Sequence, residues 1–331
     1  RRFILTRYLM RSPYDPFANL GHSEGLKSDV IGTNAGNMLF PYSISRTLMT
    51  DDVEIDYVKT TDDYLDSIDF AEVNDRYDAF VIPLANAMRS GFPEFHALTE
   101  LVRHLDMPCV IVGVGYQGRL GNANDIADDA RRSIKELFDA VLEKSAQIGL
   151  RGERSAAFVE SLGYKRDRHF RVIGCPSLYL NGPVLPLPRT LELSHQSRIN
   201  LNCKAPIYRS VQGFSIHDFM NRMIREYPNY YYIPQNSYEM MAVFTGLDLE
   251  VARDFCLQGF RIPKGYPSTP KALPYVQNRI RCFLNPNAWI DFLRQGDLNF
   301  GTRIHGNIAG ILAGVPTFIV APDQRVCELA E

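Results

Sequence analysis

The segment Gly301-Thr302-Arg303-Ile304-His305-Gly306 combines an arginine and a histidine two positions apart. It lies between a strand-like run, Leu298–Phe300, and a helical run from about Arg303 to Ala313. Free backbone N–H groups and the positive end of the helix dipole favour an anion at such a helix start. Arg303 could bind phosphate or carboxylate with two parallel hydrogen bonds, and His305 could move a proton near neutral pH. The alternative is a capped helix with a solvated Arg303 and a buried structural His305.

A second candidate is the turn Asn34-Ala35-Gly36-Asn37, which precedes a helical stretch containing Ile44 and Leu48. Asn37 is the predicted N-cap, and Gly36 would permit a tight backbone turn towards a ligand. Asn34, Gly36 and Asn37 are therefore candidate binding residues. A capped turn without a ligand explains the same pattern.

Polar residues also follow two predicted strands. Arg151 comes directly after Ile148–Leu150, and Asp323 and Glu328 come after Thr317–Val320. Ligands of open α/β sheets bind at the carboxyl ends of the strands. Arg151 is thus a candidate ligand contact, and Asp323 or Glu328 could orient His305 or hold an acceptor. A solvated loop is the alternative for the last two.

Two other patterns are rejected as sites. Gly113-Val114-Gly115-Tyr116-Gln117-Gly118 fits a dinucleotide fingerprint, but the polar segment 119–124 that follows does not open a helix. The six cysteines are scattered without C-x-x-C spacing, which argues against zinc and against a disulfide scaffold. Cys175 is interpreted as a buried structural thiol. We expect no metal and no cofactor.

The composition is typical of a soluble globular protein and not of a disordered one. Of 331 residues, 45% are hydrophobic and 22% are charged, and the net charge of -2 gives no reason to expect nucleic acid as a partner. No apolar run reaches the roughly 18 residues that a transmembrane helix needs. We expect a cytoplasmic protein, in solution or at the inner face of the membrane.

Strand-length apolar runs alternate with helical spacing along the chain, which predicts an α/β fold with parallel sheets. The proline-rich stretch between Asn181 and Gln196 separates two such series and is the expected linker. We therefore expect two Rossmann-like domains, 1–182 and 183–331, that face a cleft. The strands expected in the first are 53–58, 79–82, 110–114, 148–150 and 171–173, with helices at 133–142 and 155–162. The second should contain strands at 199–201, 230–233, 298–300 and 317–320, a helix capped by Ser215 with Ile216, Phe219, Met220, Met223 and Ile224 on its core face, and one opened by Asn285-Pro286.

Taken in order, these segments resemble the polysaccharide pyruvyl transferase family. The similarity runs from Asn34-Ala35-Gly36-Asn37 through Arg151-Gly152-Glu153-Arg154-Ser155 to Phe300–Gly306 and Asp323–Leu329, with the block around Arg303 and His305 the most specific. Asn37 stands where many members have Asp. Members usually continue past the position of Glu331, so we expect the second domain to be truncated.

The resemblance implies a glycosyltransferase-B-like fold and transfer of a pyruvyl group from phosphoenolpyruvate to a sugar of a polysaccharide or its lipid-linked precursor. The product would be a cyclic ketal. His305 would be catalytic, and Arg303, Ile304, Arg151, Asn34, Gly36, Asn37, Asp323 and Glu328 would bind substrate, with the donor on the second domain and the acceptor on the first. The stretch 212–271 matches no family segment and could select the acceptor.

Three other classes compete with this interpretation. A nucleotide-sugar glycosyltransferase of similar architecture would bind a nucleoside diphosphate in the second domain. A Rossmann oxidoreductase is disfavoured by the failed glycine fingerprint. A non-catalytic binding protein would make Arg303 and His305 incidental. The sequence does not specify the acceptor sugar or the oligomeric state.

Overall fold

The computed structural model describes residues 5–21, 24–25, 31–32, 34–118, 126–203, 210–211, 214–215, 222–223, 225–237, 240 and 278–331. Most of the helix expected after Ser215 (Ile216, Phe219, Met220 and Ile224 among its core positions) lies outside these ranges. Ser215 itself ends the short strand β9 (Phe214–Ser215), which pairs antiparallel with β8 (Ser210–Val211).

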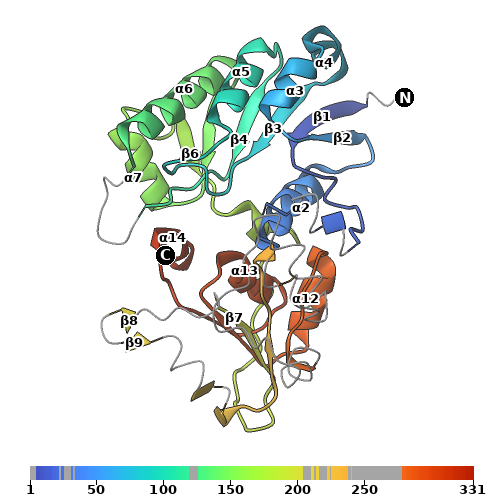
Figure 1. Cartoon of the computed structure of the whole chain (residues 1–331), viewed down its shortest axis with the longest axis vertical. Helices are drawn as coiled ribbons and strands as arrows, with labels where there is room; N and C mark the ends of the chain where they lie inside the picture. The colour runs from blue at the N-terminus through green and yellow to red at the C-terminus, as the bar shows by residue number, and fades with distance from the viewer. Residues whose placement is uncertain are drawn as a thin grey trace, which may run out of the picture. The chain divides into compact units, whose positions relative to one another are not determined.

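The chain divides into two compact units (Figure 1). The first comprises Arg1–Ala18, Phe40–Gly182 and Ala321–Glu331, and the second comprises Asn19–Leu39 and Pro183–Val320. A single break after Gly182 would place Asn19–Leu39 in the first unit and Ala321–Glu331 in the second. In the structure, Asn19–Leu39 belongs to the second unit and Ala321–Glu331 to the first.

The first unit is built on parallel strands, as the sequence predicts. Its main sheet has the order β2-β1-β3-β4, and every adjacent pair is parallel. Strands β5 and β6 form a second parallel pair, and a parallel bridge between Val114 and Leu150 links the chain after β4 to β5. The strands are β1 (Thr6–Arg11), β2 (Val53–Val58), β3 (Ala79–Pro83), β4 (Cys109–Val112), β5 (Ile148–Leu150) and β6 (Phe170–Val172).

Helices cover both faces of the main sheet. Successive strand residues point to opposite faces, and both Leu9 and Met10 of β1 are buried. Leu9 belongs to the core that α5 and α6 share, and these two helices lie side by side (Figure 1). Met10 accepts a hydrogen bond at its sulfur from Ser45 of α2, so α2 covers the other face. The helices are α2 (Gly36–Leu48), α3 (Asp62–Ser67), α4 (Phe70–Arg76), α5 (Phe95–His104), α6 (Asp128–Lys144), α7 (Glu153–Ser161) and α14 (Gln324–Ala330), with a 3₁₀ turn η1 at Pro176–Tyr179.

The second unit contains another parallel sheet, in the order β10-β7-β11-β12. Its strands are β7 (Ile199–Asn202), β10 (Tyr230–Tyr232), β11 (Leu298–Gly301) and β12 (Thr317–Ile319), and its helices are α12 (Pro286–Arg294) and α13 (Ile304–Leu312). Asn285 caps α12 by accepting a hydrogen bond from the backbone N–H of Ala288, and Pro286 is its first residue, as predicted. The α/β fold class with parallel sheets is confirmed in both units.

The two faces of this second sheet differ in chemistry. Ile199 and Leu201 of β7, with Leu298 and Phe300 of β11, belong to one apolar core. The alternating residues of these strands are three asparagines and one glycine, which has no side chain: Asn200, Asn202, Asn299 and Gly301. Because side chains alternate along a strand, these residues form the opposite face.

One expectation about burial is wrong. The sequence predicts Thr317–Val320 to be a buried strand, but Phe318 is 59% exposed. β12 occupies the edge of the sheet, next to β11 alone among the described strands, so its outer side lacks a covering neighbour.

Candidate functional site

The junction of β11 and α13 provides an uncapped helix start. Arg303 is the N-cap residue of α13, with φ −94° and ψ 122°, and its side chain makes no capping hydrogen bond. The N–H groups in the first turn of a helix have no partner within the helix. An anion can therefore be bound here by backbone amides and the helix dipole together.

Two nitrogens of the Arg303 guanidinium have no hydrogen-bond partner among the residues that the structure describes. Nε and Nη2 are both buried, and neither has a hydrogen-bond partner among the described residues. A buried charged donor without a partner is unfavourable by roughly 1–3 kcal/mol or more. These two nitrogens lie on one edge of the guanidinium and suit bidentate binding of a carboxylate or phosphate.

His305 lies in the first turn of α13 and is 3% exposed. Its ring packs against Gly36: a Cβ atom built at Gly36 would be 2.8 Å from His305 Nδ1 and 2.9 Å from Gln235 Oε1. Real Cβ atoms do not approach this closely. Position 36 must therefore be glycine for His305 and Gln235 to lie where they do, and the structure brings two predicted site residues, Gly36 and His305, together.

The turn before α2 is held by backbone and amide contacts. Asn34 Oδ1 accepts from the N–H of Gly36 at 2.8 Å, and the N–H of Ala35 donates to the carbonyl of Gln235 at 2.7 Å. The predicted capping role of Asn37 is wrong, because Asn37 lies inside α2. Its side-chain amide instead donates back to the carbonyl of Ile31 at 3.1 Å.

An asparagine network positions the start of α13 against the sheet. Asn202 Oδ1 accepts from the N–H of Arg303 at 3.3 Å, while Asn202 Nδ2 donates to Asn299 Oδ1 at 3.2 Å and to Asn307 Oδ1 at 3.1 Å. Asn299 Nδ2 then donates to the carbonyl of Gly306, and Asn307 Nδ2 donates to the carbonyl of Gly301, both at 3.2 Å. All three asparagines are at most 1% exposed.

The sequence analysis missed this network. The signal was present, because Asn at alternate positions of β7 and again in β11 is unusual on a buried strand face. Small residues of α13 make the approach to this network possible. A Cβ atom at Gly310 would lie 2.4 Å from Asn299 Nδ2, so glycine there lets the helix approach the asparagines.

Arg151 and Glu328 lie together in the first unit. Arg151 Nε and Glu328 Oε2 are 3.3 Å apart, and the two side chains are 2% and 1% exposed. Arg151 Nη1 also donates to the carbonyl of Ala85 and to Asn86 Oδ1. Glu328 Oε1 accepts from the N–H of Ser155 at 2.7 Å in the first turn of α7. The pair thus joins α14 to α7, and a role of either residue in substrate binding stays a prediction.

One glycine of the rejected fingerprint, Gly115, makes room for Arg151. A Cβ atom at Gly115 would lie 2.1 Å from Arg151 Nη2, and Gly113 has φ +69°. The first helix after them in the described chain is α6, which begins at Asp128. The expectation that segment 119–124 does not open a helix falls outside the described residues.

The side chain of Asp323 caps the start of α14. Its Oδ1 accepts from the N–H groups of Arg325 and Val326, and Oδ2 pairs with the Arg325 guanidinium at 2.5 Å. Burial opposes ionisation of Asp323, but the hydrogen bonds and charge of Arg325 outweigh it, so its pKa is lowered. Asp323 is a carboxylate at neutral pH and caps α14.

Cys175 is 3% exposed in the first unit. Burial raises the pKa of its thiol, and the positive charge of Arg151 opposes this effect without reversing it. A neutral, buried thiol is a poor nucleophile. This agrees with the interpretation of Cys175 as structural.

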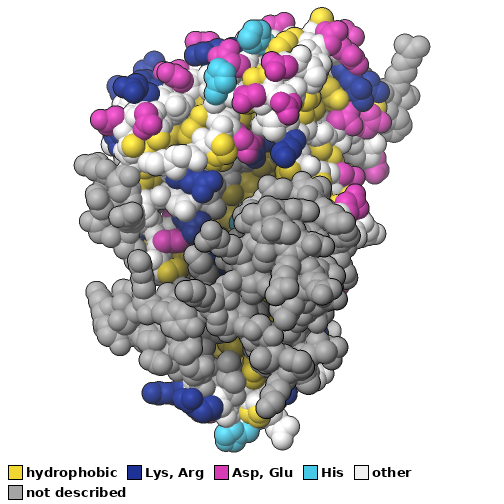
Figure 2. All heavy atoms as spheres, viewed as in Figure 1, with side chains coloured by type: hydrophobic (Ala, Val, Ile, Leu, Met, Phe, Trp, Pro, Cys, Tyr) yellow, Lys and Arg dark blue, Asp and Glu magenta, His cyan; other side chains and the backbone are white. Residues whose placement is uncertain are grey.

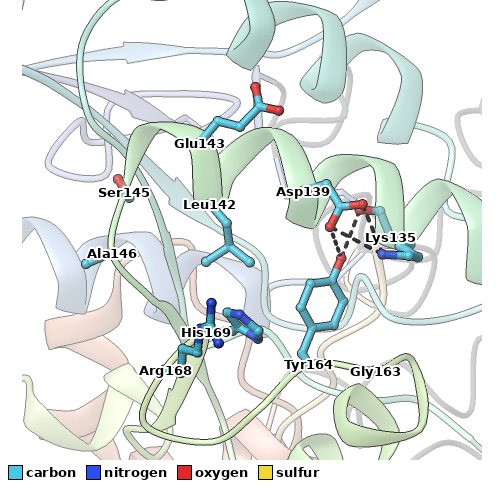
Figure 3. A pocket seen from close by; sticks show the side chains of 10 residues that line it. All are labelled: Lys135, Asp139, Leu142, Glu143, Ser145, Ala146, Gly163, Tyr164, Arg168 and His169. Atoms are coloured by element: carbon cyan, nitrogen blue, oxygen red, sulfur yellow. Dashed lines mark hydrogen bonds and ion pairs between the residues drawn. The ribbon is translucent and has the colours of Figure 1, made fainter.

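The first unit also has a surface pocket of about 660 Å³ beside α6 and the loop before β6 (Figure 3). Lys135 and the hydroxyl of Tyr164 both point to Asp139, at 3.0 and 2.7 Å. The pocket includes Ser145 and His169, which precede β5 and β6, and it therefore lies at the amino ends of these strands. None of the predicted site residues lines it.

Three further findings concern the surface charge, metal binding and membrane-spanning helices. Acidic and basic side chains are interspersed on the face of the first unit seen in Figure 2. Within the part of the chain that the structure describes, no cluster of three His, Cys, Asp or Glu side chains is arranged to hold a metal ion. No helix in that part is long and apolar enough to cross a bilayer.

The comparison with protein families gives a single clear result. The profile of the family described as "Polysaccharide pyruvyl transferase" matches residues 34–324, nearly the whole chain. The class is thus a transferase that acts on polysaccharide. The chain belongs to the polysaccharide pyruvyl transferase family.

Solved structures show weaker similarity. An uncharacterised protein from Klebsiella pneumoniae is 12% identical, with coverage of 96% of this chain and 85% of that chain and a TM-score of 0.44. HepE from Anabaena, in complex with UDP and glucose, is 10% identical, with coverage of 98% and 88% and a TM-score of 0.46. UDP-GlcNAc 2-epimerase from Neisseria meningitidis is 9% identical, with coverage of 98% and 85% and a TM-score of 0.39. No curated protein sequence matches the chain.

Proposed function

We propose that this chain transfers the pyruvyl group of phosphoenolpyruvate to two hydroxyls of one sugar, in a polysaccharide or its lipid-linked precursor. The observation that carries the proposal is the pair of buried, unpartnered nitrogens on Arg303 beside the uncapped start of α13. Phosphoenolpyruvate has a carboxylate and a phosphate, so it can occupy both anion-binding features at once. In this proposal the second unit binds the donor and the first unit binds the acceptor.

The reaction needs several proton transfers. A proton adds to the methylene carbon of the enol, which becomes the methyl group, and one sugar hydroxyl bonds to the central carbon. The bond from that carbon to the phosphate oxygen then breaks, and the second hydroxyl bonds to the same carbon. The two hydroxyls lose two protons; one balances the new methyl group, and the other leaves with inorganic phosphate.

His305 is the proposed proton carrier for these steps. It shares the first turn of α13 with the proposed anion site, and an imidazole can both give and take a proton near neutral pH. Gly36 leaves room for its ring. Ile304, between the two functional side chains, would contribute its backbone N–H to the anion site.

Calorimetric titration tests the donor. We expect phosphoenolpyruvate to bind and UDP-glucose to bind at least tenfold more weakly. The opposite order would favour a nucleotide-sugar glycosyltransferase. Phosphate release from phosphoenolpyruvate, measured with oligosaccharides that carry a free pair of neighbouring hydroxyls, tests the reaction. Binding of phosphoenolpyruvate without phosphate release across the panel would contradict the transferase assignment.

A further inference from the structure

Gln235 occupies a position that the sequence analysis did not single out. It follows β10, at the carboxyl end of the sheet of the second unit, where ligands of parallel sheets bind. The turn at Asn34 holds the backbone of Gln235 in place. The carbonyl of Gln235 accepts from the N–H of Ala35 at 2.7 Å, and the neighbouring Asn236 forms an antiparallel bridge with Asn34.

The side chain of Gln235 extends between two glycines. A Cβ atom at Gly36 would lie 2.9 Å from its Oε1, and a Cβ atom at Gly306 would lie 2.5 Å from its Nε2. Gly306 belongs to the first turn of α13, and the same Gly36 position would collide with His305. The amide of Gln235 is therefore placed against the turn where the proposed anion site lies.

The amide nitrogen of Gln235 has no hydrogen-bond partner in the part of the chain that the structure describes. Gln235 is 2% exposed, and its Nε2 is buried without a hydrogen bond to any described residue. Buried amide donors are nearly always hydrogen-bonded, because a donor withdrawn from water without a replacement is unfavourable. A buried donor that no described residue satisfies indicates a ligand with a hydrogen-bond acceptor at this position.

We propose that Gln235 is a ligand-binding residue whose side-chain amide donates a hydrogen bond to the anionic group held at the first turn of α13. The inference rests on the proposed function, because that function places an anionic donor substrate at this turn. Gln235 adds a neutral donor to the charge of Arg303 and the backbone amides of α13. The bound group is an anionic oxygen, which the carboxylate or the phosphate of the donor could provide.

Two variants separate the hydrogen bond from packing. Gln235→Met keeps the length and unbranched shape of the side chain but removes the donor. Gln235→Glu keeps the shape and adds a negative charge that repels an anion. Gln295→Met is the control for the same substitution at an exposed position away from the site, because Gln295 is the C-cap residue of α12 at the amino edge of the same sheet. Thermal unfolding identifies the variants that fold.

Calorimetry with phosphoenolpyruvate, inorganic phosphate and pyruvate provides the test. We expect Gln235→Met to weaken phosphoenolpyruvate binding about tenfold, the effect of one hydrogen bond to a charged group, and Gln235→Glu to weaken it further. Gln295→Met should bind like the parent. If Gln235→Met also weakens binding of inorganic phosphate, the Gln235 amide donates to the phosphate of the donor. If it instead weakens binding of pyruvate, the amide donates to the carboxylate.

The same measurements separate a failure of the Gln235 assignment from a failure of the proposed function. Equal dissociation constants for the parent and a folded Gln235→Met or Gln235→Glu variant would overturn the role of Gln235 while leaving the proposed function intact. A parent protein that binds none of the three compounds would overturn the proposed function and this inference with it.

Discussion

Arg303 and His305 divide the work of the proposed site between charge and proton transfer. The guanidinium has two donors that no described residue uses, and its charge exists before any reaction begins. The imidazole lies two residues on, in the first turn of α13, where it would act only when a proton moves. Substitutions at the two positions should therefore affect different measured quantities.

Arg303→Lys should weaken phosphoenolpyruvate binding by about 10- to 100-fold. Lysine keeps the positive charge but cannot form two parallel hydrogen bonds, and the loss of one charge-assisted bond is worth roughly 1.5–3 kcal/mol. Calorimetry at matched salt measures the effect, with thermal unfolding as the control for the fold. Identical affinities for variant and parent would remove Arg303 from the donor site.

His305→Ala should lower the rate of phosphate release by about 100- to 10,000-fold, the usual contribution of a general acid–base group. The dissociation constant for phosphoenolpyruvate should change by less than about tenfold, because Arg303 and the helix amides remain. His305→Gln, which fills more of the space beside Gly36, controls for packing. A parallel loss of rate and affinity would make His305 a charged ligand contact instead of a proton carrier.

At the scale of elements, the positions of Arg303 and His305 depend on how α13 is held against the sheet. Three buried asparagines join β7, β11 and α13, and one of them accepts from the backbone N–H of Arg303. Glycines at 306 and 310 let the helix approach these side chains closely. The helix start is thus fixed by hydrogen bonds with defined directions, which apolar packing does not provide.

Asn202→Leu tests this seating. The substitution leaves the N–H of Arg303 and the Oδ1 atoms of Asn299 and Asn307 without their partner, and we expect about 1–3 kcal/mol less stability in urea unfolding. Phosphoenolpyruvate binding should also weaken, because the start of α13 can shift. Asn200→Leu is the matched control, since Asn200 lies on the same face of β7 but donates to the carbonyl of Leu293 in α12. Equal effects of both variants on binding would show that the network is only structural.

At the scale of the whole molecule, sequence periodicity predicted the parallel-sheet fold class and most of the strands, but it missed β1, which lies between β2 and β3 in the first sheet. β2 and β5 have the predicted bounds. In β2, apolar residues alternate with Glu54 and Asp56, which is the period-2 pattern of a strand with one buried face. Periodicity could not show contacts between distant segments. Glu328 follows the last strand of the second unit but pairs with Arg151 in the first, and Gln235 meets Gly36 across about 200 residues. Such contacts depend on chain topology, which a local pattern does not contain.

The buried ion pair of Arg151 and Glu328 holds α14 against the rest of the first unit, and its contribution to stability can be measured. Glu328→Leu would leave the Arg151 charge buried without its carboxylate, and breaking a buried pair in this way costs about 3–5 kcal/mol. Adding Arg151→Met removes that charge, so the double variant should recover a large part of the loss. The recovery will be incomplete, because the N–H of Ser155 and the carbonyl of Ala85 lose their partners.

Urea unfolding of the parent, both single variants and the double variant gives the coupling energy of the pair. Additive losses would show that the two side chains do not stabilise one another. The rate of phosphate release by the folded double variant, measured over a range of acceptor concentrations, then decides between the two roles considered for Arg151. A parental KM for the acceptor would identify a structural pair that holds α14 against α7. A raised KM for the acceptor in a fully folded protein would instead support Arg151 as a substrate contact, as its place after β5 predicts.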